Sequence, residues 1–289
     1  ILDGAKRIIA VLAGHPGGSS WKEVRRGAEN AIRKCEAKCK FPKKTRKHRR
    51  GDFAALSWGI SHGGGQKKPG NLCHSAHNAK ALSELTADKN LSRIAKYGST
   101  ALALWAPKLY THYEENFNSL LDNDDSLRRN WPDSVFASYT INFGPRTVCR
   151  PHRDFANLPY GWCAITALGD FNPKQGGHLI LWDLKLAIEF PPGSTILIPS
   201  AALRHSNAPI NSRETRYSFT QYSAGGLFRW VDQGFQRTTD FEATLTAEEM
   251  EVEERRRDER CKRGLSFFST HESLSSDQVA RSNYLVRSM

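Results

Sequence analysis

Six short apolar segments between residues 135 and 222 constrain the fold of this chain most strongly. Gly-Pro, Asn-Pro, Gly-Gly and Pro-Pro-Gly sequences lie between them, and these residue types favour turns. Many short strands at close spacing predict two packed antiparallel sheets, that is, a sandwich or a jelly roll. The segments are residues 135–143, 162–168, 178–182, 186–190, 195–199 and 216–222.

Helical patterns precede and follow these segments. The sequence from Ser20 to Glu23 has the form of a capping box, so we expect a helix from there to about residue 40. A second capping box begins at Thr246 and precedes a charged helix at 251–263. Three further helices are predicted by apolar residues at helical spacing, over residues 78–85, 91–105 and 108–121.

We therefore expect an α+β fold with a double-stranded β-helix core, of the jelly-roll or cupin type, and supporting N-terminal helices. The expected parts are a basic, helical N-terminal region (1–130), the core (131–240) and a charged C-terminal helix with its tail (241–289). The tail is rich in serine, so we expect it to be poorly ordered unless Phe267 and Phe268 dock it on the core.

Two histidines and one aspartate are candidate metal ligands. His152 and Asp154 are two residues apart, so on an extended strand their side chains point to the same face. His205 follows the segment 195–199 and can return to the same end of a jelly roll. Such a 2-His-1-carboxylate set suits non-heme Fe(II) and leaves three coordination positions open. We predict that these three residues form the metal site and catalytic centre; the alternative is that both histidines are structural.

Arg216 is the candidate anchor for a co-substrate. It lies eleven residues after His205, and on a strand it shares a face with Ser218. An arginine with a hydroxyl two residues further on can hold a carboxylate through a two-pronged contact and one more hydrogen bond. The distal carboxylate of 2-oxoglutarate needs such a partner while the keto acid chelates iron. Arg213 has the opposite parity and is the second choice, and a surface charge is the alternative.

The positive charge of the chain is concentrated near its N-terminus. Residues 22–50 hold thirteen Lys and Arg against three Glu, which accounts for +10 of the net charge of +12. Such a segment commonly binds a polyanion, and DNA or RNA is the obvious candidate. Within it, residues 40–50 could instead serve as a nuclear import signal, and a solvated helix face with a basic linker is equally compatible.

A glycine-rich loop at residues 57–70 is a second candidate contact for substrate. Gly63, Gly64 and Gly65 are consecutive, which lets a backbone approach a ligand closely. The loop lacks the glycine spacing of a nucleotide-phosphate loop. We expect a mobile loop that touches substrate, and a plain connector is the alternative.

Other features exclude several classes of protein. No run of eighteen apolar residues occurs, and residues 1–12 lack the apolar core and cleavage site of a signal peptide. We therefore expect a soluble, intracellular chain with no membrane partner, and a monomer. The six cysteines are scattered without a CxxC pair, which argues against both a disulfide framework and a closed zinc site.

With these residues in place, the chain resembles the Fe(II)/2-oxoglutarate dioxygenases over roughly residues 131–235. Within them it is most similar to the TET/JBP DNA-oxidising branch, in particular its mushroom members linked to transposons. In TET-like enzymes the Asn three residues after the metal Asp helps to hold the flipped cytosine, which implies that Asn157 binds substrate. The segment from Gly177 to Trp182 is similar to a family strand whose His contacts 2-oxoglutarate. The resemblance thus implies a co-substrate contact for His178, which by residue type alone could be a buried core histidine.

The resemblance implies oxidation of 5-methylcytosine in double-stranded DNA to 5-hydroxymethyl-, 5-formyl- and 5-carboxylcytosine. It implies Fe(II), 2-oxoglutarate and O2 as cofactor and co-substrates, a base flipped out of the duplex, and a nuclear location. The zinc-bound cysteine-rich region of the animal enzymes is missing from this sequence, so contacts to the DNA backbone must come from elsewhere. Three alternatives stay open: an N6-methyladenine DNA demethylase, a protein side-chain hydroxylase, and a DNA-binding module with an inactive iron site.

Overall fold

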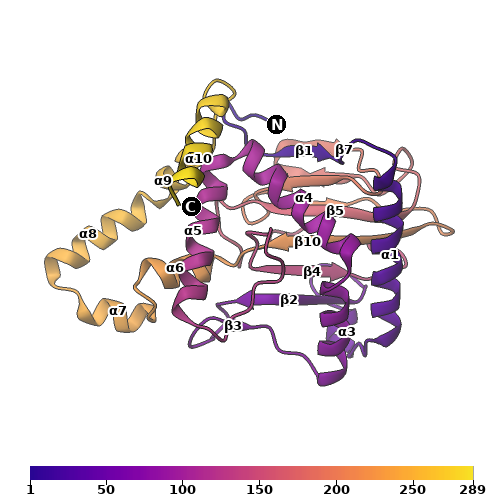
Figure 1. The fold of residues 1–289 in the computed structure, drawn as a ribbon, viewed down its shortest axis with the longest axis horizontal. Helices are drawn as coiled ribbons and strands as arrows, with labels where there is room; N and C mark the ends of the chain where they lie inside the picture. The colour runs from indigo at the N-terminus through magenta and orange to yellow at the C-terminus, as the bar shows by residue number, and fades with distance from the viewer. Residues whose placement is uncertain (289) are drawn as a thin grey trace.

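The computed structural model describes residues 1–288, and a seven-stranded antiparallel sheet lies at its centre (Figure 1). The strand order is β1-β8-β5-β10-β4-β2-β3. Three of these strands precede residue 131, so the sheet extends beyond the expected core range of 131–240. The strands are β1 (Val11–Gly14), β2 (Ala55–Ser61), β3 (Gly70–Asn71), β4 (Ser138–Asn142), β5 (Cys163–Asp170), β8 (Thr195–Ile198) and β10 (Thr215–Tyr222).

A smaller antiparallel sheet faces the inner side of the large one. Its order is β7-β6-β9, formed by β7 (Leu186–Ile188), β6 (Leu179–Leu181) and β9 (His205–Asn207). One hydrophobic cluster joins the two sheets, because it contains Ile165 and Ile196 from the large sheet and Leu179 and Leu181 from the small one. This arrangement of two facing antiparallel sheets with helices outside confirms the predicted α+β jelly-roll fold.

Alternation along β10 separates the core from the interior of the jelly roll. Tyr217 and Phe219 lie in the cluster formed with the covering helices, so Arg216 and Ser218 point the other way, between the two sheets. All four side chains are buried. The same strand therefore supplies packing on one face and polar groups on the other.

Helices cover the outer face of the large sheet. Apolar residues of α1 (Ser20–Lys38), α3 (Ala76–Thr86) and α4 (Lys89–Trp105) pack there on Tyr139, Ile141 and Phe219. The helix α5 (Pro107–Asn123) packs on α4, and the single turn α2 (Lys43–Arg46) precedes β2. The helices predicted between residues 78 and 121 are confirmed.

The capping box predicted at Ser20 is wrong. Ser19 occupies the N-cap with helical φ and ψ, and neither it nor Ser20 accepts a hydrogen bond from the first turn. The helix start is held by tertiary contact instead, since the indole of Trp21 donates to the Gly193 carbonyl at 3.0 Å. The capping box at Thr246 is confirmed, because Thr246 and Glu249 exchange both hydrogen bonds.

The C-terminal region forms an arm that leaves the core and returns to it (Figure 1). After η1 (Trp182–Leu184) and the strands, α6 (Gly225–Asp232) leads into α7 (Thr238–Thr244), α8 (Ala247–Asp258) and α9 (Arg260–Ser266). We call α7 to α9 the C-terminal arm. The chain then continues as α10 (Leu274–Ser288), which packs on α5.

Two aromatic side chains dock the start of the tail on the core. Phe268 is buried, and the ring of Phe267 stacks on His112 with 4.4 Å between the centroids. The docking by Phe267 and Phe268 that the sequence set as the condition for an ordered tail is thus present, while Met289 lies outside the described residues. Among residues 1–288, no helix has the length and apolar character needed to cross a membrane.

Substitution of Phe219 tests how much the outer core contributes to the stability of the fold. Its ring is fully buried and lies against Trp131 and Tyr139, with centroids 5.8 and 5.5 Å away. We expect Phe219→Ala to lower the free energy of unfolding by about 3–5 kcal/mol, through lost burial and the cavity left behind. Urea unfolding measures it. The matched control is Phe155→Ala, because Phe155 is 75% exposed. Similar losses for the two variants would contradict this account of the core.

Candidate metal centre

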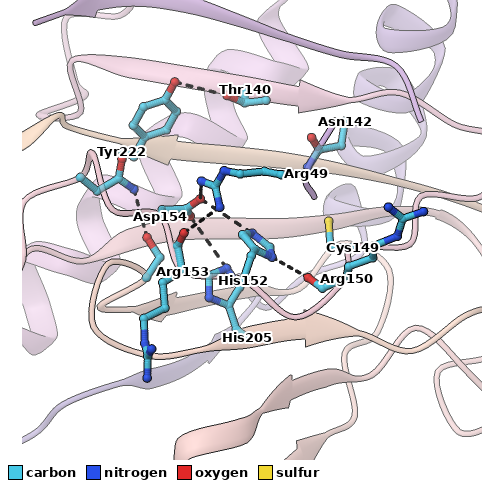
Figure 2. Close-up of polar contacts among 12 residues, drawn as sticks. Arg49, Thr140, Asn142, Cys149, Arg150, His152, Arg153, Asp154, His205 and Tyr222 are labelled. Atoms are coloured by element: carbon cyan, nitrogen blue, oxygen red, sulfur yellow. Dashed lines mark hydrogen bonds and ion pairs between the residues drawn. The ribbon is translucent and has the colours of Figure 1, made fainter. Parts of the chain in front are cut away.

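The three predicted ligands lie together at one end of the jelly roll (Figure 2). One ligand atom from each of His152, Asp154 and His205 lies within 4.8 Å of the others. The Asp154 carboxylate is 3.7 Å from Nε2 of His152 and 3.8 Å from Nε2 of His205. These separations are too long for hydrogen bonds and leave space for an ion between the three groups.

Main-chain hydrogen bonds fix this convergence. The N–H of His152 donates to the carbonyl of His205, and the N–H of His205 donates back to the carbonyl of His152, both at 2.9 Å. The N–H of Asp154 donates to the Ser200 carbonyl at 3.0 Å. The segment after β4 is thus paired with the start of β9 and with the turn that precedes it.

Both imidazoles present the nitrogen that a metal needs. Nδ1 of His152 is 2.7 Å from the Arg150 carbonyl, and Nδ1 of His205 is 2.9 Å from the Leu203 carbonyl. A carbonyl oxygen only accepts, so each Nδ1 carries the proton and each Nε2 keeps its lone pair. Burial and then the neighbouring His205 lower the pKa of His152 to about 4. His152 is therefore neutral at pH 7, and a donor set of two imidazoles and one carboxylate fits Fe(II).

Arg216 is a buried cation without a carboxylate partner among the described residues. It is 2% exposed, and its Nε has no hydrogen-bond partner there. Burial lowers its pKa to about 10, so it still carries its charge at pH 7. A buried charge that lacks a counter-ion is costly and is a strong binding group for an anion. This environment fits the distal carboxylate of a keto diacid.

A shared hydrogen-bond acceptor, the Thr147 carbonyl, links the Arg216 side chain to the strand that carries His205. Its Nη1 donates to the Thr147 carbonyl at 3.3 Å, and Nδ2 of Asn207 donates to the same carbonyl at 3.1 Å. Asn207 lies two residues after His205 on β9, which is roughly 7 Å along a strand and on the same face. Ser218, also buried, accepts from Nδ2 of Asn142 at 2.8 Å. The side-chain oxygen of Asn142 is a further buried polar atom without a partner in the described chain.

Arg49 is a site residue that the sequence placed only within the basic segment. Its Nη2 is 3.9 Å from the Asp154 carboxylate, and its Nη1 donates to the Arg153 carbonyl at 3.0 Å. The backbone next to it is held as well, since the N–H of Arg150 donates to the Arg50 carbonyl at 2.7 Å. The segment 49–50 therefore lies against the metal centre. No local pattern indicates this contact, because the partners are about a hundred residues apart.

Asn157 and His178 differ in how the structure places them. The N–H of Asn157 donates to the Asp154 carbonyl at 2.9 Å, and its Nδ2 donates to Ser200 Oγ at 3.0 Å, so its amide lies beside the centre. His178 immediately precedes β6, where its carbonyl accepts from the Ala208 N–H. Within residues 1–288, no described side-chain contact links its imidazole to the three ligands or to Arg216. A co-substrate contact for His178 stays a prediction.

Comparisons with known proteins find likeness in structure alone. No protein-family model matches the chain, and no curated protein matches it. NgTET1 in complex with 5mC DNA gives a TM-score of 0.48 at 18% identity, over 69% of this chain and 68% of that one. A Pseudomonas putida prolyl-4-hydroxylase gives 0.36 at 15%, over 74% and 90%. OsALKBH1 gives 0.35 at 10%, over 74% and 95%.

Replacement of Arg216 tests whether burial of its charge destabilises the ligand-free protein. We expect Arg216→Met to raise the free energy of unfolding of the ligand-free protein by about 1–3 kcal/mol, because the variant no longer buries an unneutralised charge. The Thr147 carbonyl keeps its hydrogen bond from Asn207. Urea unfolding measures the change. The exposed Arg255→Met serves as the control, with a change within about 0.5 kcal/mol. A destabilised Arg216→Met would show that the guanidinium is already satisfied in the fold.

Proposed function

We propose that the chain is an Fe(II)- and 2-oxoglutarate-dependent dioxygenase that oxidises 5-methylcytosine in DNA. The observation that carries the chemistry is the position of Arg216. Its unneutralised guanidinium is buried between the two sheets and shares the Thr147 carbonyl with Asn207, which lies two residues after the proposed metal ligand His205. A metal site alone would fit many reactions, whereas this pairing favours a keto diacid as co-substrate.

Each residue then has a distinct task. His152, Asp154 and His205 hold the metal, and Arg216 with Ser218 binds the distal carboxylate of 2-oxoglutarate. When bound, iron and 2-oxoglutarate use O2 to supply the oxidising power for hydroxylation of a methyl group, with succinate and carbon dioxide as products. Burial of Arg216 excludes water from the carboxylate site, which strengthens the ion pair formed there.

The opening of the site suits a flipped base within DNA. Arg49 and Arg150 are each 56% exposed there, and Arg153 is 39% exposed. Extrusion of the base costs roughly a few kcal/mol, which contacts between these arginines and phosphates offset in part. Asn157 donates to Ser200 through its Nδ2, so its amide oxygen is available to accept from the exocyclic amino group of cytosine. We also propose a nuclear location, because residues 40–50 have the basic composition of a nuclear import signal. Membership of the mushroom branch stays a prediction.

The substrate is tested by incubation with methylated duplexes followed by mass spectrometry of the nucleosides. With Fe(II) and 2-oxoglutarate, we expect 5-hydroxymethyl-, 5-formyl- and 5-carboxylcytosine from a 5-methylcytosine duplex, and none when either is omitted. Loss of methyl from N6-methyladenine in a matched duplex, with 5-methylcytosine untouched, would favour the demethylase instead. Succinate formation with neither duplex oxidised would point to a protein substrate. Unchanged duplexes without succinate would leave only a DNA-binding module.

Asn157 separates base recognition from oxygen chemistry. We expect Asn157→Ala to lose most base oxidation, because the flipped cytosine loses a hydrogen-bond partner, while 2-oxoglutarate is still converted to succinate. The measurement is the ratio of oxidised cytosine to succinate. His152→Ala serves as the control and should abolish both products, since it removes a metal ligand. An unchanged ratio in Asn157→Ala would contradict the proposed role of this residue.

A further inference from the structure

A groove of about 740 Å³ lies between the core and the C-terminal arm. The core contributes the loop from Phe155 to Tyr160 and the glycine-rich loop at His62 to Gly64. The arm and α6 contribute mainly charged residues. We call this hollow the arm groove, and its charged lining consists of Arg229, Asp232, Glu253, Arg256, Glu259, Arg260 and Arg263.

The arm groove adjoins the metal centre through the turn at residues 154–157. Phe155 and Asn157 both line it, and both belong to the turn that begins at the ligand Asp154. Phe155 is 75% exposed, an unusual position for a large aromatic side chain, and Arg49 lies over its ring at 5.6 Å. A chain lying in the groove would therefore pass directly beside the proposed base-reading residue.

The charges in the groove are unevenly neutralised. Glu253 lies 3.6 Å from Arg257, which does not line the groove and which also pairs with Glu242 at 2.6 Å. That leaves Asp232 and Glu259 as the other acids. None of the ion pairs found within residues 1–288 includes Arg229, Arg256, Arg260 or Arg263. Four arginines thus face three acids, so the lining carries one more positive than negative charge, and none of its arginines is used in an ion pair of the described chain.

The arm itself does not need these arginines for packing. No residue of α8 is buried, and Figure 1 shows α7 and α8 extending away from the sheets. The arm is anchored where it returns to the core, because Gly264 lies so close to Tyr160 that a Cβ there would be 2.5 Å from the ring. A solvated helix that is anchored at its base and lines a groove with cations is suited to contact a ligand rather than to build a core.

We propose that the arm groove binds the phosphodiester backbone of the DNA strand that carries the target base. Arg256, Arg260 and Arg263 contact phosphates through their planar guanidinium groups. Phe155 stacks on a base next to the flipped one, as exposed aromatic side chains do on single-stranded nucleic acid. This proposal rests on the proposed function, and it assigns a backbone contact to the arm in addition to the N-terminal basic segment.

The test compares two charge-matched double variants in binding to a duplex that contains 5-methylcytosine. Arg256→Ala with Arg260→Ala removes two groove arginines. Arg255→Ala with Lys262→Ala removes two charges from the same helices outside the groove lining. Fluorescence anisotropy over a series of KCl concentrations measures affinity and its salt dependence. We expect the groove variant to lose at least about tenfold in affinity and its log–log salt slope to fall by about 2, since each lost phosphate contact lowers it by roughly 0.9.

The control variant should keep a slope close to that of the wild type. Phe155→Ala should bind the duplex at least about fivefold more weakly than the wild type, with an unchanged salt slope, because stacking releases no counter-ions. Circular dichroism checks that α8 is intact. The proposal would be overturned if the groove variant bound the duplex with the same affinity and salt slope as the wild type. It would also be overturned if the control variant lost as much affinity as the groove variant, or if the wild type bound polyglutamate as tightly as the duplex. Its failure is distinguishable from that of the proposed function, because nucleoside oxidation by the wild-type chain is measured separately.

Discussion

A pair of main-chain hydrogen bonds between His152 and His205 holds the candidate site together. These residues are far apart in sequence, yet each donates to and accepts from the other at 2.9 Å. The bridge forms because the jelly roll brings the segment after β4 and the start of β9 to the same end of the two sheets. It also orients the side chains, since both imidazoles then donate through Nδ1 to nearby carbonyls. Without this bridge the donor set would not converge.

Burial of the Arg216 charge is unfavourable for the ligand-free fold but favourable for a binding site. The packing face of β10 is occupied by Tyr217 and Phe219 among the helices, which fixes the strand firmly. The opposite face then holds a guanidinium whose charge is unneutralised within the described chain. Natural proteins tolerate such locally unfavourable groups where they bind a ligand. The outer core therefore stabilises β10, and the inner face of this strand is suited to bind an anion.

Much of this arrangement was predictable from the sequence because it follows from short-range periodicity. Alternation along residues 216–222 predicted that Arg216 and Ser218 would share a face, and turn residues marked β4 to β8 and β10, whereas β9 was not predicted. The capping box at Thr246 was predictable from its four residues alone. The similar pattern at Ser20 failed because a tertiary hydrogen bond from Trp21, and not a local cap, fixes the start of α1.

The parts that were not predictable depend on contacts between distant segments. The approach of Arg49 to Asp154 and the entry of β1 to β3 into the large sheet both join residues remote in sequence. The arm groove is of the same kind, because the run of arginines in α8 reads as a solvated helix until the core loop that faces it is known. Local patterns carry no information on such pairings.

The most direct measurement of the central claim is an anaerobic titration of the Fe(II)-loaded protein with 2-oxoglutarate, followed by calorimetry. The account predicts one binding site per chain in the wild type and binding at least about a hundredfold weaker in Arg216→Met. The reason is that removal of one partner from a buried arginine–carboxylate pair costs several kcal/mol. Equal affinity in the two proteins would show that the guanidinium does not hold the keto acid, and the dioxygenase assignment would lose its main support.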